Sequence, residues 1–180
     1  MGKIVVLSGS PRKDGNTELL VNSFAEGAKK HNDVEVISIR EYHVQPCCGC
    51  NSCRTGSRKC FQKDDMCSVF EKLSDADILV IASPVYFYGV SAQLKAVIDR
   101  FHSPERQQAG FKGMALLLVA ADTIPNLFDS IISQYRLTLD YFQLKDYGMV
   151  TVGGVEEKGA IKGSEKLKEA YALGLSLNNV

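Results

Sequence analysis

Short apolar runs alternate with amphipathic stretches along most of the chain, and this alternation limits the folds that the sequence can adopt. The first run, residues 3–9 (KIVVLSG), is continuous and rich in β-branched residues, which is typical of a strand buried on both faces. Residues 16–31 then place Leu20, Phe24 and Ala28 at helical spacing. Four more strands are predicted at 33–39, 76–84, 112–121 and 147–154, and four more helices at 64–75, 91–102, 126–142 and 164–177.

Alternating units of this size predict an α/β fold: a doubly wound, five-stranded parallel sheet with helices on both faces. A chain of 180 residues suits a single domain, residues 1–180, in which residues 43–63 form a Cys-rich insertion between the second strand and the second helix. Ligands of such sheets lie beyond the carboxyl ends of the strands, where the strand order reverses. We therefore expect the site in the loops 8–17, 83–91 and 120–126.

Composition and charge exclude several classes of function. Lys plus Arg and Asp plus Glu both number 21, so the chain has no overall field that would hold nucleic acid or an anionic membrane. The apolar run at the N-terminus is too short for a signal peptide or a membrane span, and we expect a cytoplasmic protein. In reducing cytoplasm, clustered cysteines bind metals or act in redox chemistry more often than they form disulfides.

The loop after the first strand has the composition of an anion site. Small and hydroxyl-bearing residues at a helix start offer backbone N–H groups and hydroxyls to a phosphate. The glycines fit neither the Walker A pattern nor the Rossmann pattern, since Gly9 and Gly15 are wrongly spaced and no lysine follows Gly15. Asn16 or Thr17 is also expected to cap the helix. The residues that remain around one anion are Ser8, Ser10, Arg12, Asn16 and Thr17.

The loop after the third strand is aromatic. Pro84, Tyr86, Phe87 and Tyr88 follow one another closely at the strand end, where exposing three aromatic rings is costly. They could pack on a neighbouring subunit. A flat ligand that carries a phosphate accounts for both loops. FMN bound where the strand order reverses in a flavodoxin-type fold would place its phosphate at the first strand and its ring at the third.

The motifs GSPRKDGNT, DDM, SPVYFYGVSAQLKAVIDR and KGAI resemble the group of NAD(P)H-dependent FMN reductases and iron-sulfur flavoproteins. The resemblance implies a flavodoxin-like fold, a homodimer or homotetramer, and chemistry at flavin N5 without a catalytic side chain. It also implies ion pairing or subunit packing, not chemistry, for Lys95, Asp99 and Arg100. By this resemblance the FMN phosphate is bound by Ser10, Arg12, Asn16 and Thr17, which Ser8 can join, and the isoalloxazine is lined by Pro84, Val85, Tyr86 and Phe87.

The loop after the fourth strand departs from the family pattern. Relatives often carry glycines there, whereas this chain has AADTIPNLF, which leaves the outer contacts of the flavin ring undefined. We expect Asp122 to cap the following helix. The three histidines are scattered, and we expect them at the surface.

All six cysteines lie between residues 47 and 67, and one set has cluster-like spacing. Cys47, Cys50, Cys53 and Cys60 read C-x2-C-x2-C-x6-C, which can wrap a [4Fe-4S] cluster, and the spacing is similar to that of iron-sulfur flavoproteins, where the cluster lies near FMN. A plain thiol loop is an equally open reading, and a zinc site or a disulfide formed in air is less favoured. Spacing shows the capacity to bind a metal and not its occupancy.

Basic residues accompany these cysteines. Arg54, Arg58 and Lys59 could neutralise an anionic cluster or attract an acidic electron-donor protein, and a merely solvated loop is an equally good reading.

The sequence therefore predicts an FMN-dependent oxidoreductase that passes electrons from NAD(P)H, its co-substrate, to a small acceptor such as a quinone or a flavin. One alternative is an iron-sulfur flavoprotein whose [4Fe-4S] cluster takes electrons from a ferredoxin-like partner. A second is a non-catalytic electron carrier of the flavodoxin type.

Overall fold

Five parallel strands form the centre of the protein in a computed structural model, which describes residues 1–55 and 58–178, without the side chains of residues 107 and 108. The strands are β1 (Gly2–Ser8), β2 (Asn32–Ser38), β3 (Ile78–Pro84), β4 (Gly113–Val119) and β5 (Lys145–Val152). The helices are α1 (Asn16–Ala28), α2 (Met66–Leu73), α3 (Ala92–Arg100), α4 (Asp129–Phe142) and α5 (Glu165–Ser176), with short 3-10 helices η1 (Ile39–Glu41), η2 (Ser52–Arg54) and η3 (Pro104–Gln108).

The sheet has the order β2-β1-β3-β4-β5, and all of its neighbouring strands are parallel. From β1 the chain builds outward first to β2 and then, on the other side, to β3, so the strand order reverses beside β1. This is the flavodoxin-like topology, and the predicted fold class is confirmed. The reversal point opens a crevice at the carboxyl ends of β1 and β3.

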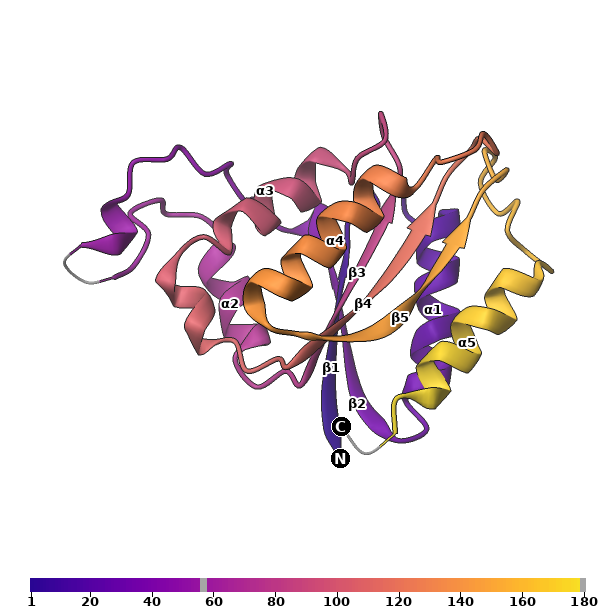
Figure 1. Ribbon diagram of the computed structural model, residues 1–180, viewed down its shortest axis with the longest axis horizontal. Coiled ribbons are helices and arrows are strands. Elements are labelled where there is room, and N and C mark those ends of the chain that lie inside the picture. The colour runs from indigo at the N-terminus through magenta and orange to yellow at the C-terminus, as the bar shows by residue number, and fades with distance from the viewer. Residues whose placement is uncertain (56–57, 179–180) are drawn as a thin grey trace.

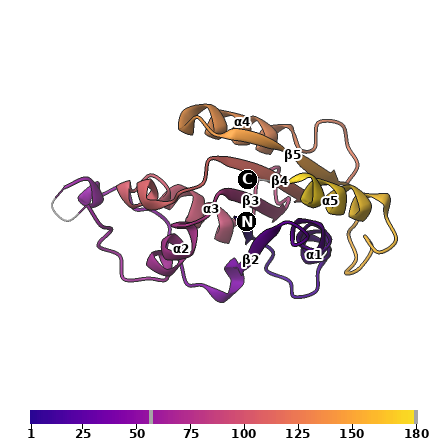
Figure 2. The ribbon, with the colours of Figure 1, turned by 90° about the horizontal axis from the view of Figure 1, so that it is seen from below.

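Helices cover both faces of the sheet (Figures 1 and 2). One apolar core joins α1 and α5 to the sheet through residues such as Val6 and Phe24, and the other joins α2, α3 and α4 through residues such as Leu7 and Leu94. Every residue of β4 is buried, because this strand lies between both layers.

The helices α1 and α5 touch at two glycines. A Cβ on Gly27 would come 2.1 Å from the Tyr171 carbonyl oxygen, and a Cβ on Gly174 would come 2.1 Å from the Phe24 carbonyl oxygen. Only residues without a side chain allow the two backbones to approach this closely.

All ten predicted strands and helices are present, with shifted ends. The largest differences are of three residues: α1 ends at Ala28 and not at residue 31, and α4 begins at Asp129 and not at residue 126, since Asn126 has a left-handed φ of 62°. The 3-10 helices were not predicted. No helix within the described ranges is both long and apolar enough to cross a membrane.

Candidate functional site

A pocket of about 180 Å³ lies where the loops after β1, β3 and β4 meet the loop after β5. It gathers residues more than a hundred positions apart in the sequence. Seven of the nine predicted cofactor residues line it: Ser10, Arg12, Asn16, Thr17, Pro84, Val85 and Tyr86. The structure therefore brings the predicted anion loop and the predicted ring loop together.

The loop after β1 is held against the start of α3. Gly9 donates its N–H to the Ala82 carbonyl oxygen at 2.8 Å and accepts a hydrogen bond from the Ser91 hydroxyl at 2.7 Å. A Cβ on Gly9 would lie 2.7 Å from that of Leu94. The first glycine of the motif is thus required by packing between the loop and α3.

Helix α1 begins in this loop without a side-chain cap. Its N-cap residue is Gly15, and no side chain accepts a hydrogen bond from the first turn at that position. The expectation that Asn16 or Thr17 caps the helix is wrong. The N–H groups of the first turn remain available to an anion, which the helix dipole also favours.

The Asn16 side chain is hydrogen-bonded to the loop after β5. Its amide nitrogen donates to the carbonyl oxygens of Val155 at 3.0 Å and Glu157 at 2.8 Å, and its oxygen accepts from the N–H groups of Gly159 at 2.9 Å and Ile161 at 3.3 Å. An amide has two donor hydrogens and two acceptor lone pairs, so all of its capacity is used. Asn16 holds the loop after β5 against the pocket and has only its backbone N–H left for a ligand.

Two predicted cofactor residues do not line the pocket. Ser8 is 2% exposed at the end of β1, and its hydroxyl has no hydrogen-bond partner among the described residues. Phe87 points fully into solvent.

The aromatic loop is a tight hairpin turn. Tyr86 and Gly89 exchange two backbone hydrogen bonds of 2.9 and 3.0 Å, and the residues between them, Phe87 and Tyr88, have left-handed φ angles of 49° and 60°. This conformation matches a type I′ turn, which favours Asn and Gly at those positions. Bulky residues are strained there, and both rings of this turn are exposed.

The loop after β4 supplies small residues in place of the family's glycines. Ala120 and Ala121 line the pocket, and the Asp122 carbonyl oxygen accepts a hydrogen bond of 3.0 Å from Gly154. The expected cap by Asp122 is wrong, because α4 begins seven residues later. The side chain instead accepts a hydrogen bond from the Thr123 N–H at 2.6 Å.

Sequence reasoning missed several lining residues. These are Gly15, Val119, Ala120, Ala121, Val155 and Glu156. The motif KGAI at residues 158–161 is adjacent to the last two and was the available signal for them.

The Cys segment, residues 43–63, projects from the body of the protein at the left of Figure 1, beyond α2 and α3. Its residues 56 and 57 lie outside the described residues. Cys47, Cys48 and Cys50 are exposed, and Cys53 and Cys60 are half-buried. Within the ranges described, no three potential metal ligands are gathered at one point.

A buried ion pair closes the base of this segment. Arg100 donates to Asp64 at 2.7 Å and to the Gln45 carbonyl oxygen at 3.1 Å, and the Asp64 carboxylate also accepts from the Gln45 N–H at 2.9 Å. The side chains of Arg100 and Asp64 are 3% and 1% exposed. Burial raises the pKa of Asp64, but the hydrogen bonds from Arg100 and from the backbone outweigh it, and the net pKa is lowered. The ion pairing implied for Arg100 is therefore present.

Comparisons with known proteins agree with this geometry. The family model described as NADPH-dependent FMN reductase matches residues 2–157. An iron-sulfur flavoprotein of Methanocaldococcus jannaschii is 43% identical over 99 residues, which cover 54% of this chain and 51% of that protein, so the match spans about half of the relative's length. An iron-sulfur flavoprotein of Archaeoglobus fulgidus is 31% identical over 180 residues, covering 96% of this chain and 77% of that protein.

Solved structures support the fold. The NAD(P)H:quinone oxidoreductase of Methanothermobacter marburgensis is similar with a TM-score of 0.73, over 98% of this chain and 99% of that one, at 15% identity. At that identity the likeness concerns the fold alone. The family match over most of the chain, together with the pocket that its motifs build, shows that this chain belongs to the NADPH-dependent FMN reductase family.

Proposed function

We propose that this protein is an FMN-dependent oxidoreductase that passes electrons from NAD(P)H through FMN to a small acceptor, such as a quinone or a free flavin, in the cytoplasm. The observation that carries the proposal is the pocket shared by the anion loop at Ser10–Thr17 and the strand end at Pro84–Tyr86. FMN requires both a phosphate site and a surface for its ring at this point of the fold.

The residues fit the cofactor in two parts. The pocket is smaller than the usual 300–1,000 Å³ or so of a ligand site, so we expect it to enclose the phosphate end and leave the ring at its open side. Arg12 and the first N–H groups of α1 would neutralise the phosphate. When bound, FMN supplies an acceptor for a hydride or single electrons at its N5 atom, and the chain supplies orientation.

The test uses two neighbouring cations with different positions. Arg12 lines the pocket, whereas Lys13 is exposed beside it and does not. We expect Arg12→Gln to weaken FMN binding about tenfold in a fluorescence titration and Lys13→Gln to leave it unchanged. Anaerobic stopped-flow mixing of the FMN-loaded protein with NADPH and NADH should bleach the flavin. A loaded flavin that neither nucleotide bleaches would refute the reductase and favour the electron carrier.

A second candidate is an iron-sulfur flavoprotein that takes electrons from a ferredoxin-like donor. It is favoured by the relatives named iron-sulfur flavoprotein and by the four thiols of Cys47, Cys50, Cys53 and Cys60. These thiols have the right chemistry, but they are not gathered within the described residues, and we derive no step through a cluster. Iron and acid-labile sulfide, measured after anaerobic purification, decide the matter: four of each per chain support the cluster, and their absence with full FMN removes it.

We also propose a homodimer or homotetramer. Phe87 and Leu137 expose large apolar side chains, and Tyr141 adds an aromatic ring on the same helix as Leu137. Light scattering on the eluted FMN-loaded protein measures the mass, and a monomer at micromolar concentration would contradict this proposal.

A further inference from the structure

A second and larger depression lies away from the FMN pocket, between the Cys segment, the end of α3, η3 and the end of α4. Its volume is about 760 Å³, within the range of small-molecule sites. The elements that form it lie at the left of both Figures 1 and 2. We call it the basic groove, and its lining includes Arg54, Arg58, His102, Arg106, Tyr141 and Phe142.

Three guanidinium groups face the groove without counter-ions. Within the described part of the chain, no carboxylate pairs with Arg54, Arg58 or Arg106, and residues 56, 57, 107 and 108 carry no acidic side chain. The acid in the lining, Asp99, is engaged by the Lys95 ammonium at 2.5 Å. Like charges gathered in this way repel one another, and an anion relieves that repulsion.

Arg54 is held in place across the groove. Its guanidinium lies 2.9 Å from Nε2 of His102. Arginine can only donate, so the ring nitrogen is the acceptor in this contact. This contact joins the Cys segment to the end of α3 and orients the Arg54 fork.

The guanidinium group of Arg106 lies against two aromatic rings. Its central carbon lies 3.6 Å from the centre of Phe142 and 5.1 Å from that of Phe111. Its Nε is buried and has no hydrogen-bond partner among the described residues, and burial lowers the pKa of the group. A stacked guanidinium of this kind keeps a fixed plane for a bidentate partner.

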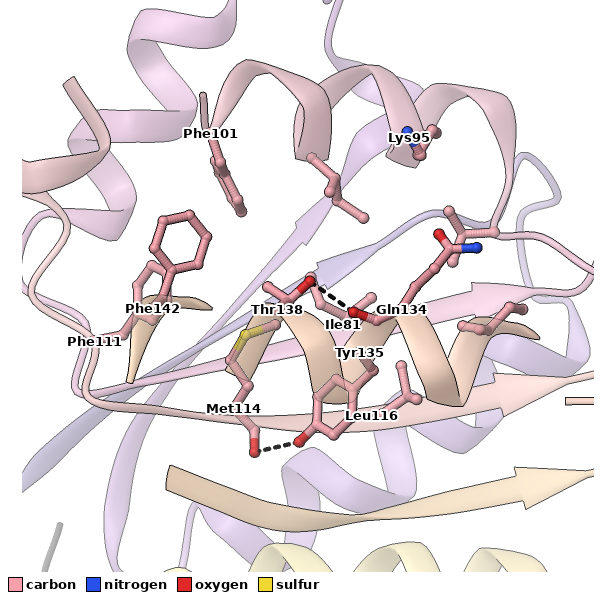
Figure 3. A pocket seen from close by; sticks show the side chains of 13 residues that line it. Ile81, Lys95, Phe101, Phe111, Met114, Leu116, Gln134, Tyr135, Thr138 and Phe142 are labelled. Carbon is pink, nitrogen blue, oxygen red and sulfur yellow. Dashed lines mark hydrogen bonds between the residues drawn. The ribbon is translucent and has the colours of Figure 1, made fainter. Parts of the chain in front are cut away.

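The groove continues into an apolar cavity between α3 and α4. This cavity measures about 70 Å³ and shares Ile98, Phe101, Thr138 and Phe142 with the groove. Figure 3 shows Phe101 and Phe142 at one end of it and Lys95 and Gln134 at the other. The cationic rim therefore stands next to an apolar recess large enough for a small ring or a short alkyl chain.

We propose that the basic groove binds a small organic anion, whose phosphate or carboxylate group is held by Arg54, Arg58 and Arg106 while its apolar ring or chain lies against Phe101 and Phe142. The inference is independent of the proposed function, because the groove shares no residue with the FMN pocket.

The test uses FMN-loaded protein, so that the phosphate cradle beside α1 is already filled. The probe is 4-fluorophenyl phosphate, followed by fluorine NMR at about 0.15 M salt, where exposed charges are screened. We expect saturable binding that is at least about tenfold tighter than that of inorganic phosphate or of 4-fluorophenol. 4-Fluorobenzoate separates a carboxylate preference from a phosphate preference. No saturable binding of either aromatic anion, or equal binding of inorganic phosphate, would overturn the proposal.

Neighbouring residues again supply a matched control. Arg58 lines the groove, and Lys59 is exposed beside it and does not line it. We expect Arg58→Gln and Arg54→Gln to weaken binding of the probe about tenfold each, and Lys59→Gln to leave it unchanged. Equal losses for Arg58→Gln and Lys59→Gln would show a diffuse electrostatic surface, such as one that attracts an acidic protein, and would refute a built site. Circular dichroism of the variants checks that these exposed substitutions leave the fold intact.

Discussion

Replacing Arg100 by methionine should expose what the buried ion pair contributes. Methionine keeps much of the apolar volume but leaves the Asp64 carboxylate, which is 1% exposed, without its cation. Removing one partner of a buried pair usually costs about 3–5 kcal/mol. Asp64 keeps hydrogen bonds from the N–H groups of Gln45 at 2.9 Å and Met66 at 3.2 Å. We therefore expect the free energy of unfolding, measured with urea at pH 7, to fall by about 3 kcal/mol, the lower end of that range.

The pH dependence gives the sharper signature. In the wild type the pKa of Asp64 is lowered, so its contribution to stability is present above the unfolded pKa of about 3.9 and is lost as the pH falls through the folded value. In Arg100→Met, burial acts without the opposing arginine and raises the pKa of Asp64. Protonation then relieves the penalty, and we expect the loss of stability to shrink to about half between pH 7 and pH 4.

The control is Lys95→Met on the same helix, which removes an exposed pair with Asp99 and should cost about 0.5 kcal/mol at both pH values. Trypsin should also cleave the Cys segment faster in Arg100→Met, because Arg100 ties that segment to α3 through the Gln45 carbonyl oxygen. A loss below about 1 kcal/mol at pH 7, or a loss that does not change with pH, would refute the reasoning.

Three further perturbations test other parts of the structure. Gly174→Ala should lower the free energy of unfolding by about 1–3 kcal/mol, despite better helix propensity, since its Cβ meets the Phe24 carbonyl oxygen; thermal melting measures this. Phe87→Asn with Tyr88→Gly should raise stability by about 1–2 kcal/mol in the same assay by relieving left-handed strain, and a lower melting temperature would contradict that cause. Asn16→Ala should weaken FMN binding about tenfold in a fluorescence titration, with helix content unchanged, because the loop after β5 loses four hydrogen bonds; unchanged affinity would deny its positioning role.

The strands and helices were predictable because their apolar patterns are local. Residues 3–9 contain a β-branched run that only a doubly covered strand suits, and β1 occupies Gly2–Ser8. The alternation and the handedness of crossovers predict a parallel, doubly wound sheet, whereas its flavodoxin-like strand order was implied by the family resemblance. Seven of the nine predicted cofactor residues line one pocket because the carboxyl ends of β1 and β3 meet at the reversal of strand order.

The features that were not predicted depend on contacts between residues far apart in the sequence. Asn16 reads locally as a helix cap, but its partners Val155 and Glu157 are 139 and 141 residues away. The basic groove is likewise assembled from three separate parts of the chain, with Arg54, Arg106 and Phe142 on different elements. Side-chain hydrogen bonds and cavities of this kind depend on tertiary placement, which single-sequence patterns do not encode.

The glycine contact between α1 and α5 has a consequence for how the protein is made. It joins residues near 27 to residues near 174, and Asn32 likewise donates to the Leu177 carbonyl oxygen. On the ribosome, the face of α1 that carries Gly27 is synthesised early and stays uncovered until α5 emerges. At about 5–20 residues per second, the chain between them takes seconds to synthesise. The contact between α1 and α5 therefore forms only after the four strands that separate these helices along the chain have been synthesised.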